Sequence, residues 1–548
     1  MFGLMQKQDL LISGLLEHAA THHGRVEIVS HVTATSVYRS SWAEVRDRSK
    51  RLANALTALG VNPGQRVATL AWNTHRHLEL YFGVAGMGAV SHTVNPRLFA
   101  EQITYIINHA ADEYVFFDLG FADLIAGIAD QLPTVRGFVA LCDRSEMPQV
   151  ALPNLLCYED LIAEASPDYE WPSFDENTAS SLCYTSGTTG NPKGVLYSHR
   201  STVLHSWTAC TVDGLGLSAK DSVLLAVPMF HVNAWGIPYA SAMSGAKLVL
   251  PGPNVSGDKL YALMRDEACT FSLGVPTVWL GFFNHVETNR DKLDLSEIKL
   301  ARVVVGGSAA PRAIVEKFDK IFGAFVIQAW GMTETSPLAT IGNLLPSQLA
   351  LPKDAQYDIQ ARQGRAVFGV DVAIFNPEGR MMPHDGSSVG EIRVRGPWVV
   401  SAYYGDKPGA ALDEAGWFST GDVALIGTDG FVQITDRTKD VIKSGGEWIS
   451  SIDLENVAVG HPKVREAAVI GVAHSKWQER PLLIIVPKPG ENISAAEMTE
   501  FMKDRVARWW LPDDVVFVDD LPHTATGKLL KTKLREQFKG HRLSTDEA

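Results

Sequence analysis

The chain has 548 residues, of which 46% are hydrophobic and 20% charged, so it can bury large cores and divide into at least two domains. Its formal charge of -13 argues against a broad basic face, and we therefore exclude nucleic acid as a partner. Five cysteines without a CxxC pair indicate neither a disulfide framework nor a thiolate zinc site, and we expect a cytoplasmic protein. The sequence has no apolar run of the roughly 18 residues that a membrane span needs.

Helix and strand patterns alternate from the start of the chain. Residues 1–24 lack a signal-peptide pattern and place apolar side chains at helical spacing, which predicts a surface or dimer-packing helix. A helical pattern over residues 41–60 ends at Gly60 and precedes an apolar strand over 66–72. The same order returns in "AEQITYIINHAA" and "EYVFFD". This alternation predicts an α/β fold with helix-covered sheets.

The pattern of predicted helices and strands changes in the later part of the chain. Residues 299–322 read as a strand, a Gly-Gly turn and a helix, with Ser308 as a candidate N-cap and Pro311 in the first turn. From about Ser388, short alternating segments between glycine turns predict a small β-rich module. Another α/β run follows residues 436–440, where we place a domain boundary.

The stretch "YTSGTTGNPKG", Tyr184 to Gly194, combines hydroxyls, glycines and a lysine. Glycines let a backbone approach a ligand closely, and the hydroxyls and amides supply donors, so the loop suits a phosphate. It is not the P-loop of NTPases, because Pro192 stands where the second glycine would be. A glycine-rich hairpin between two strands is the alternative structural interpretation.

Five segments together resemble the adenylate-forming superfamily, which includes acyl-CoA synthetases, luciferases and the adenylation domains of peptide synthetases. They are the loop above, "QAWGMTE" (328–334), "WFSTGDVA" (417–424), "DRTKDVIKSGGEWIS" (436–450) and "TATGK" (524–528). The resemblance covers essentially the whole chain. It implies an ATP- and acid-binding N-terminal domain (1–435), a hinge (436–440) and a small mobile C-terminal domain (441–548).

The family reaction joins a carboxylic acid to ATP, giving an acyl adenylate and pyrophosphate, and then transfers the acyl group to a thiol, here that of coenzyme A. The resemblance implies ATP, Mg²⁺ and coenzyme A as cofactors, and a homodimer as the assembly. It assigns the phosphates to Thr185, Ser186, Gly187, Thr188, Thr189, Gly190 and Lys193. It assigns the magnesium ion to Thr185 and Glu334, whose oxygens suit a hard cation.

The same resemblance places the nucleoside. Trp330 occupies the position of the family's adenine-packing aromatic, and Asp422 would accept hydrogen bonds from the ribose hydroxyls. Thr333 would touch the α-phosphate and Arg437 the ribose or phosphate. Backbone contacts and shape come from Gln328, Ala329, Gly331 and Met332. Taken singly, Trp330 could be core packing, Asp422 part of a β-turn and Glu334 a surface charge.

The C-terminal motifs carry the catalytic lysine and the hinge. Lys528 would bridge the carboxylate and the α-phosphate, stabilising the transition state. Lys439 falls on the hinge position. The resemblance places Lys443, Gly445, Gly446, Glu447 and Trp448 near the pantetheine tunnel, although a charged β-hairpin is the alternative. Relatives often have Lys or Arg where this chain has His523, and Lys531 could be a secondary contact or a surface charge.

The acid pocket resembles that of fatty acyl-CoA synthetases. His231 would lie near the ATP phosphates and Trp235 at the pocket mouth. Other wall residues would be Gly306, Gly307, Ser308, Trp330 and Pro337. The pocket motifs contain no residue that would place a fixed positive charge beside the α-carboxylate of an amino acid. We therefore favour an aliphatic acid as the substrate.

Two substrate classes fit this pocket. The chain is similar to the methylmercaptopropionate-CoA ligases of marine bacterial sulfur metabolism and to medium- and long-chain fatty acyl-CoA synthetases. Two tryptophans beside the pocket favour the short thioether acid, because sulfur packs well on aromatic edges. A luciferase-like oxygenase, an acyl-AMP ligase serving a carrier protein and a non-catalytic adenylate-binding scaffold are the alternatives from other classes.

Overall fold

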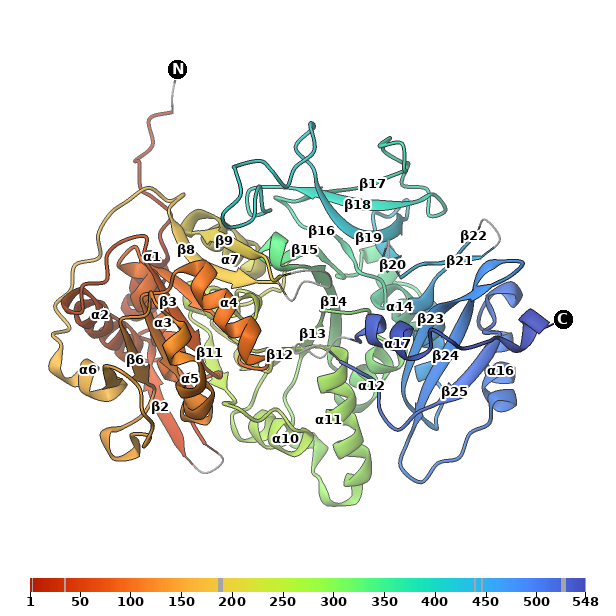
Figure 1. Cartoon of the computed structure of the whole chain (residues 1–548), viewed down its shortest axis with the longest axis horizontal. Helices are drawn as coiled ribbons and strands as arrows, with labels where there is room; N and C mark the ends of the chain where they lie inside the picture. The colour runs from red at the N-terminus through yellow and green to blue at the C-terminus, as the bar shows by residue number, and fades with distance from the viewer. Residues whose placement is uncertain are drawn as a thin grey trace.

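The computed structural model describes residues 1, 3–33, 36–185, 191–437, 440–444, 447–523 and 529–547, and for residues 447, 448 and 547 it describes the backbone alone. It confirms the predicted α/β fold. A large N-terminal domain holds two helix-covered sheets and a small β-rich module, and a smaller C-terminal domain holds a fourth sheet (Figure 1). Among the described residues, no helix is both long and apolar enough to cross a membrane.

The first large sheet has the order β7-β6-β5-β3-β4-β8-β9 and is parallel except for the β8–β9 pair. Its strands are β3 (Arg66–Leu70), β4 (Val90–Thr93), β5 (Tyr114–Phe117), β6 (Gly137–Ala140), β7 (Leu155–Cys157), β8 (Ala179–Tyr184) and β9 (Gly194–Ser198). The antiparallel β8–β9 hairpin flanks the predicted phosphate loop, so the hairpin interpretation and the phosphate interpretation are compatible.

The second large sheet has the order β16-β15-β14-β13-β12-β10-β11-β1-β2. Its strands are β1 (Glu27–His31), β2 (Val37–Ser41), β10 (Ser222–Leu225), β11 (Lys247–Leu250), β12 (Phe271–Gly274), β13 (Arg302–Val305), β14 (Phe325–Gly331), β15 (Leu338–Ile341) and β16 (Arg365–Ala366). Strands β10, β12, β13 and β14 are parallel neighbours, so their carboxyl ends meet at one edge. Ligands bind at such edges in open α/β sheets.

The two smaller sheets follow in sequence. The predicted β-rich module is the antiparallel sheet β17 (Asp371–Phe375), β18 (Val389–Arg395), β19 (Phe418–Ile426) and β20 (Val432–Arg437). The C-terminal sheet, drawn in blue in Figure 1, contains β21 (Ile442–Ser444), β22 (Glu447–Ile449), β23 (Val464–His474), β24 (Gln478–Pro487) and β25 (Asp514–Phe517).

The helices cover these sheets. Those before residue 250 are α1 (Ile12–His22), α2 (Trp42–Ala58), α3 (His75–Gly86), α4 (Ala100–Ala110), α5 (Ala122–Ile128), α6 (Tyr158–Glu164), α7 (His199–Cys210), α8 (Val232–Trp235) and α9 (Ile237–Ser244). Later ones are α10 (Gly257–Asp266), α11 (Pro276–Thr288), α12 (Arg312–Phe322), α13 (Pro346–Leu349), α14 (Lys353–Gln360), α15 (Ser451–Val459), α16 (Ala495–Lys503) and α17 (Lys531–Gln537). Short 3₁₀ turns are η1 (Leu119–Phe121), η2 (Ala129–Gln131), η3 (Arg144–Glu146), η4 (Arg290–Lys292), η5 (Leu295–Glu297), η6 (Thr333–Thr335), η7 (Arg508–Trp510) and η8 (Ser544–Glu547).

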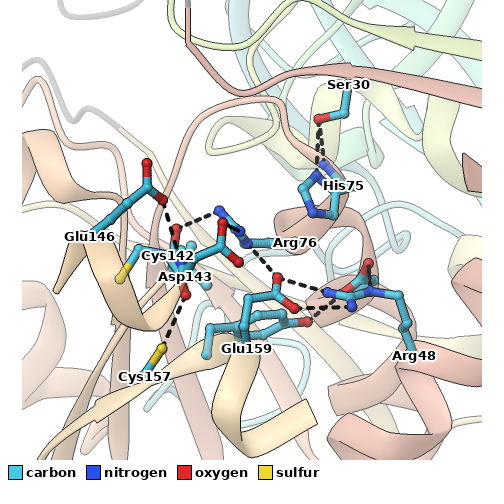
Figure 2. Close-up of polar contacts among 12 residues, drawn as sticks. Ser30, Arg48, His75, Arg76, Cys142, Asp143, Glu146, Cys157 and Glu159 are labelled. Carbon is cyan, nitrogen blue, oxygen red and sulfur yellow. Dashed lines mark hydrogen bonds and ion pairs between the residues drawn. The ribbon is translucent and has the colours of Figure 1, made fainter. Parts of the chain in front are cut away.

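Helix α3 lies between the two large sheets. Its Tyr81 belongs to the core of the nine-stranded sheet, and its Leu80 to that of the seven-stranded sheet. All of its residues are buried, including charged ones, and these are paired. Figure 2 shows Arg48 of α2 and Arg76 of α3 directed at Glu159 of α6, with nitrogen–oxygen distances of 2.9 and 2.7 Å. The buried Glu79 of α3 also pairs with Arg48 at 2.7 Å, so ion pairs fix three helices together.

Two local predictions at the start of α12 are wrong. Helix α12 begins at Arg312 with Pro311 as its N-cap, so Ser308 does not cap it. The backbone of Pro311, at φ -56° and ψ 133°, is not helical, and the preceding residues form a loop. Helix α1 agrees with the predicted surface helix, because it buries one face, at Ile12, Leu16 and Ala19, and exposes the other, at Gly14, His18 and Thr21.

Candidate active site

A cavity of about 700 Å³ opens where β10, β12, β13 and β14 end. Residues of the C-terminal domain, among them Glu455 and Lys531, line it as well. It gathers most of the described residues that the sequence singled out: Thr185, Lys193, His231, Trp235, Gly306, Gly307, Ser308, Gln328, Ala329, Trp330, Gly331, Met332, Thr333, Glu334, Pro337, Asp422 and Arg437. The cavity has the size of a small-molecule site.

The predicted adenine and ribose residues contact each other directly. Nε1 of Trp330, at the end of β14, donates a hydrogen bond of 2.9 Å to Oδ2 of Asp422 on β19. Nε of Arg437 lies 3.2 Å from the other carboxylate oxygen, because Asp422 and Arg437 are opposite each other on β19 and β20. Both Trp330 and Asp422 are buried. The carboxylate is therefore fixed at the cavity wall beside a large aromatic ring.

The predicted metal ligand Glu334 is held by a residue that the sequence did not single out. The hydroxyl of Tyr403 donates a hydrogen bond of 2.8 Å to Oε1 of Glu334. Nζ of Lys193 stands 4.7 Å from the centre of the Tyr403 ring. Burial, followed by the charge of Glu334, raises the pKa of Tyr403 well above its usual value, so the phenol stays protonated. Tyr403 thus connects the phosphate lysine with the acidic residue.

Gln328 shapes the glycine-containing wall. Its side-chain oxygen accepts a hydrogen bond of 3.0 Å from the backbone of Ala310, and its amide nitrogen donates one of 3.3 Å to the carbonyl of Ser308. Gly307, with φ +80°, adopts a conformation that other residues rarely take. The role of Gln328 seen here is to hold the loop after β13, which presents Gly306 to Ser308 to the cavity.

Another part of the cavity wall is neutral and largely apolar. The ring of Trp235 lies against Gly306, where an added Cβ would stand 3.1 Å from Cη2 of the indole. His205 accepts a hydrogen bond of 3.2 Å from the backbone of Leu338, and burial lowers its pKa to about 4. The imidazole is therefore uncharged near pH 7. Leu215 and Leu338 line the cavity too.

Asn73 is a positioning residue that sequence reasoning missed. Its amide donates hydrogen bonds of 2.8 and 2.7 Å to the carbonyls of Leu225 and Val227 and accepts one of 2.7 Å from the backbone of Met229. The segment that leads to His231 is thereby fixed to the neighbouring sheet. No local pattern marks Asn73 or Tyr403, because their partners are 69 or more positions away.

The C-terminal domain adds charge to the cavity. Nζ of Lys531 pairs with Oε1 of Glu455 at 2.8 Å. Burial lowers the pKa of Lys531, but attraction to Glu455 and Asp436 outweighs it, so the pKa is raised. Backbone N of Ser451 donates a hydrogen bond of 2.9 Å to Asp436, which links α15 to the end of β20. Lys531 is therefore a largely buried, ion-paired cation at the cavity wall and not a surface charge.

Several predicted residues lie outside the described residues: Ser186, Gly187, Thr188, Thr189, Gly190, Lys439, Gly445, Gly446 and Lys528. The side chains of Glu447 and Trp448 do so as well. Lys443 is exposed on β21 and is not among the described residues that line the cavity. Its backbone donates a hydrogen bond of 2.9 Å to Glu479. The place predicted for Lys443 near the pantetheine tunnel stays a prediction.

The described residues fit a magnesium ion that is shared with phosphate. Glu334 offers a carboxylate and Thr185 a hydroxyl at the cavity wall, and both are oxygen ligands of the kind that Mg²⁺ prefers. In the described part of the chain, no group of three His, Cys, Asp or Glu residues could hold a metal by itself. The protein side of such a site would thus depend on substrate oxygens to complete it.

Comparisons with known proteins agree with this geometry. Residues 15–404 match the family model "AMP-binding enzyme", and residues 453–528 match "AMP-binding enzyme C-terminal domain". The chain is 52% identical to the 3-methylmercaptopropionyl-CoA ligase of Ruegeria lacuscaerulensis, over 98% of this chain and 99% of that protein. It is 51% identical to the medium-chain-fatty-acid-CoA ligase of Ectopseudomonas oleovorans, over 98% of each.

A solved structure has the same fold. ATP-bound MatB from Rhodopseudomonas palustris superposes with a TM-score of 0.80 at 26% identity, covering 97% of this chain and 99% of that one. The family model spans most of the chain, and the relatives match nearly end to end. The chain belongs to the AMP-binding enzyme family.

Proposed function

We propose that this protein is an ATP- and Mg²⁺-dependent acid-CoA ligase whose acid is 3-methylmercaptopropionate. The acid attacks the α-phosphate of ATP, giving acyl-AMP and pyrophosphate, and the thiol of coenzyme A then displaces AMP. The observation that carries the proposal is the Trp330–Asp422–Arg437 cluster, which sits at the carboxyl end of parallel strands beside Glu334. That arrangement fits a nucleotide whose phosphates point to Lys193, with Glu334 and Thr185 available to hold a magnesium ion.

The described residues have separate tasks in this scheme. Trp330 packs against adenine and Asp422 binds the ribose hydroxyls. Lys193 attracts the phosphates, while Tyr403 orients Glu334. Glu334 and Thr185 would hold a magnesium ion, and the chemistry that this ion would supply is withdrawal of charge from the leaving pyrophosphate. Lys528, which lies outside the described residues, would hold the acid's carboxylate against the α-phosphate.

The neutral part of the cavity wall supports an apolar acid as the substrate. This part is formed by Trp235, Leu215, Leu338 and the uncharged His205. None of these four side chains offers a charge for an amino acid's α-ammonium or α-carboxylate. Sulfur packs favourably against aromatic rings, which favours the thioether acid over its carbon analogue. The relative that bears the methylmercaptopropionyl-CoA name supports the same choice, and the medium-chain relative, at 51% identity, supports the alternative.

The same proposal divides the chain into residues 1–435, a hinge at 436–440 and a mobile domain at 441–548. Lys439 at the hinge would turn the C-terminal domain so that Lys443 and residues 445–448 replace Lys528 at the cavity. Contacts of Asp436 with Ser451 and Lys531 would then belong to the adenylate-forming pose. We also propose a cytoplasmic homodimer, for which sedimentation analysis is the direct measurement.

The test is CoA-dependent AMP formation from ATP across methylmercaptopropionate, propionate, butyrate, valerate, octanoate and palmitate. The thioether acid should have the highest kcat/KM and should exceed valerate, its carbon analogue of equal chain length. A maximum at octanoate or palmitate would instead identify a fatty acyl-CoA synthetase. Adenylate formation without transfer to CoA would point to a carrier-protein ligase, and light emission with an added luciferin to an oxygenase. Turnover of no acid would leave the scaffold interpretation.

A further inference from the structure

Strand β8 ends at Tyr184 and strand β9 begins at Gly194. Next to these strand ends, the backbone nitrogen of Thr185 donates a hydrogen bond of 2.9 Å to the carbonyl of Lys193. Both Thr185 and Lys193 line the cavity, and they are the residues proposed for a metal contact and a phosphate contact. Their positions therefore depend on the contacts that hold the ends of the two strands.

A histidine on helix α4 holds the end of β8. Nδ1 of His109 lies 2.6 Å from the hydroxyl oxygen of Tyr184, and the two rings meet edge to face with their centroids 5.9 Å apart. Burial, followed by the charge of Asp112, raises the pKa of Tyr184 well above its usual value. The phenol therefore stays protonated and has a hydrogen to donate to Nδ1 of a neutral imidazole.

The same histidine contacts the residue that holds the start of β9. The backbone nitrogen of Tyr404 donates a hydrogen bond of 2.8 Å to the carbonyl of Gly194, and its ring meets the His109 ring edge-on at 5.6 Å. Gly194 is packed tightly, because an added Cβ would stand 3.0 Å from Cβ of Tyr404 and 3.1 Å from Cζ of Tyr184. A displacement of either tyrosine would therefore shift Gly194 and the adjacent Lys193.

His109 belongs to a well-packed helix and lies outside the cavity. Its ring stacks on Tyr105 of the same helix, with centroids 5.4 Å apart and an interplanar angle of 18°. Helix α4 packs into the core of the first large sheet through the buried Ile103, Ile106 and Ile107. The His109 side chain is exposed, and it is not among the described residues that line the cavity. It would therefore act on a ligand only through the residues that it holds.

We propose that His109 is a positioning residue for ATP, which acts by holding Tyr184 and Tyr404. These two tyrosines fix the strand ends that carry Thr185 and Lys193. The inference deepens the proposed function and rests on it, because it assigns part of the phosphate-binding geometry to a histidine outside the cavity. A hydrogen bond fixes the direction of the tyrosine hydroxyl, whereas ring packing alone lets the ring slide, so we assign the effect to the hydrogen bond.

Three substitutions separate the hydrogen bond from the ring packing. His109→Phe keeps an aromatic ring between Tyr105 and Tyr404 and removes the hydrogen bond. His109→Asn removes the ring but places an amide atom where Nδ1 stands, so Tyr184 keeps a partner. Tyr184→Phe removes the same hydrogen bond from the other side. The double variant of His109→Phe and Tyr184→Phe completes the cycle.

The first readout is the dissociation constant of a non-hydrolysable ATP analogue with Mg²⁺, measured by titration calorimetry without acid or CoA. We expect His109→Phe and Tyr184→Phe each to raise this constant by about fivefold, a size typical of the loss of one hydrogen bond. The double variant should bind the analogue as the single variants do, because all three lack the same contact. His109→Asn should bind it nearly as the wild type does.

Tyr114→Phe is the matched control for these variants. Tyr114 is on β5 of the same sheet, and its hydroxyl donates a hydrogen bond of 3.2 Å to the carbonyl of Leu59. Neither residue is among the described residues that line the cavity, so this variant should leave the dissociation constant unchanged. An equal rise in the control would overturn the inference, because it would show a general loosening of the sheet. Effects that multiply in the double variant, or an equal loss in His109→Asn and His109→Phe, would overturn it too.

The second readout is steady-state kinetics with methylmercaptopropionate. In His109→Phe the KM for ATP should rise by about fivefold, while kcat and the KM for the acid stay within about twofold of the wild type. A parallel rise in the KM of both substrates would contradict the inference, because a purely structural defect acts that way. If the wild type binds the analogue but activates no acid, the proposed function fails, and the binding data still decide the role of His109.

Discussion

The indole nitrogen of Trp330 donates a hydrogen bond of 2.9 Å to the carboxylate of Asp422, 92 positions further along the chain. One residue belongs to the nine-stranded sheet and the other to the β-rich module. The bond joins the ring proposed to pack on adenine to the carboxylate proposed to bind the ribose. One hydrogen-bonded pair of side chains would therefore contact both parts of the nucleoside.

This coupling predicts the effect of Trp330→Phe, which keeps an aromatic ring but removes the donor. Asp422 retains Arg437 as a partner. Hydrogen bonds to charged groups contribute about 1.5–3 kcal/mol, and the lower end of that range corresponds to a rise in the KM for ATP of roughly tenfold. The KM for the acid should change little. An unaltered ATP KM in steady-state kinetics would show that the bond does not orient the ribose acid.

Tyr403→Phe tests the assignment of Glu334 to magnesium. The substitution keeps the ring beneath Lys193 and removes only the hydroxyl that orients the carboxylate. Residues that orient metal ligands typically affect metal affinity by an order of magnitude or more, so the Mg²⁺ concentration for half-maximal activity should rise by roughly tenfold.

The neighbouring Tyr404 provides the control for this experiment. Its hydroxyl contacts only the carbonyl of Ala110, at 3.5 Å, among the hydrogen bonds of the described residues. Tyr404→Phe should leave the magnesium titration as in the wild type. If both variants shift it equally, the effect comes from general loosening of the loop.

Lys528→Ala should separate the two half-reactions. Removing a cation that meets developing charge costs about 10²–10³ in rate, so pyrophosphate exchange should fall by that factor. Thioester formation from supplied acyl-AMP should be largely spared. Equal loss of both would contradict the division of labour, as would selective loss of the second step.

His523 predicts a pH-dependent contribution to stability. Its ring nitrogen lies 3.2 Å from Glu466, and hydrogen bonding to that carboxylate raises the pKa of the imidazole. A raised histidine pKa gives stabilisation that is fully present below the unfolded pKa of about 6.5 and is lost as the pH rises through the folded value. His523→Gln should therefore lower the melting temperature at pH 5.5 and have little effect at pH 9.

A lysine at the same position tests whether charge is the cause. His523→Lys carries its charge at both pH values, so its melting temperature should not show the drop at pH 5.5. Equal destabilisation by glutamine at the two pH values, measured by calorimetry, would mean that His523 acts through packing alone.

The buried ion pairs beneath the first sheet predict a stability effect without a specific catalytic one. Glu79→Ala removes one of the two carboxylates that pair with Arg48, the other being Glu159, and the acceptor of the Tyr158 hydroxyl. Removing one member of a buried pair typically costs about 3–5 kcal/mol. Urea unfolding should show a loss of that order, with the activity of the folded fraction retained.

The exposed Glu164 on α6 provides the comparison. Glu164→Ala should change the free energy of unfolding by no more than about 0.5 kcal/mol. An equal loss of unfolding free energy in the two variants would show that the burial of Glu79 does not add to its effect on stability.

The sequence by itself determined the fold class and the family, and most of the described residues that it singled out line the cavity. This was possible because the residues that line the cavity occur in contiguous segments. Residues 328–334 and 417–424 each contribute several cavity-lining residues from a strand end or turn. Local spacing also predicted α2, whose N-cap Ser41 accepts a hydrogen bond from the backbone of Glu44. Short-range patterns record such features because the interacting groups are neighbours in the chain.

Only the tertiary structure decided which distant residues complete the site. Tyr403 on Glu334 and Asn73 on Met229 join groups that no spacing relates. The partners of the buried α1 face, α2 and α9 among them, followed from tertiary packing, which an amphipathic pattern leaves open. The backbone of residues 232–236 is the clearest case, because all five have positive φ although Val, Ala and Trp disfavour it locally. This conformation is set by hydrogen bonds from Asn233 to strand β8 and by packing against that strand, whose free energy outweighs the local preference of those residues.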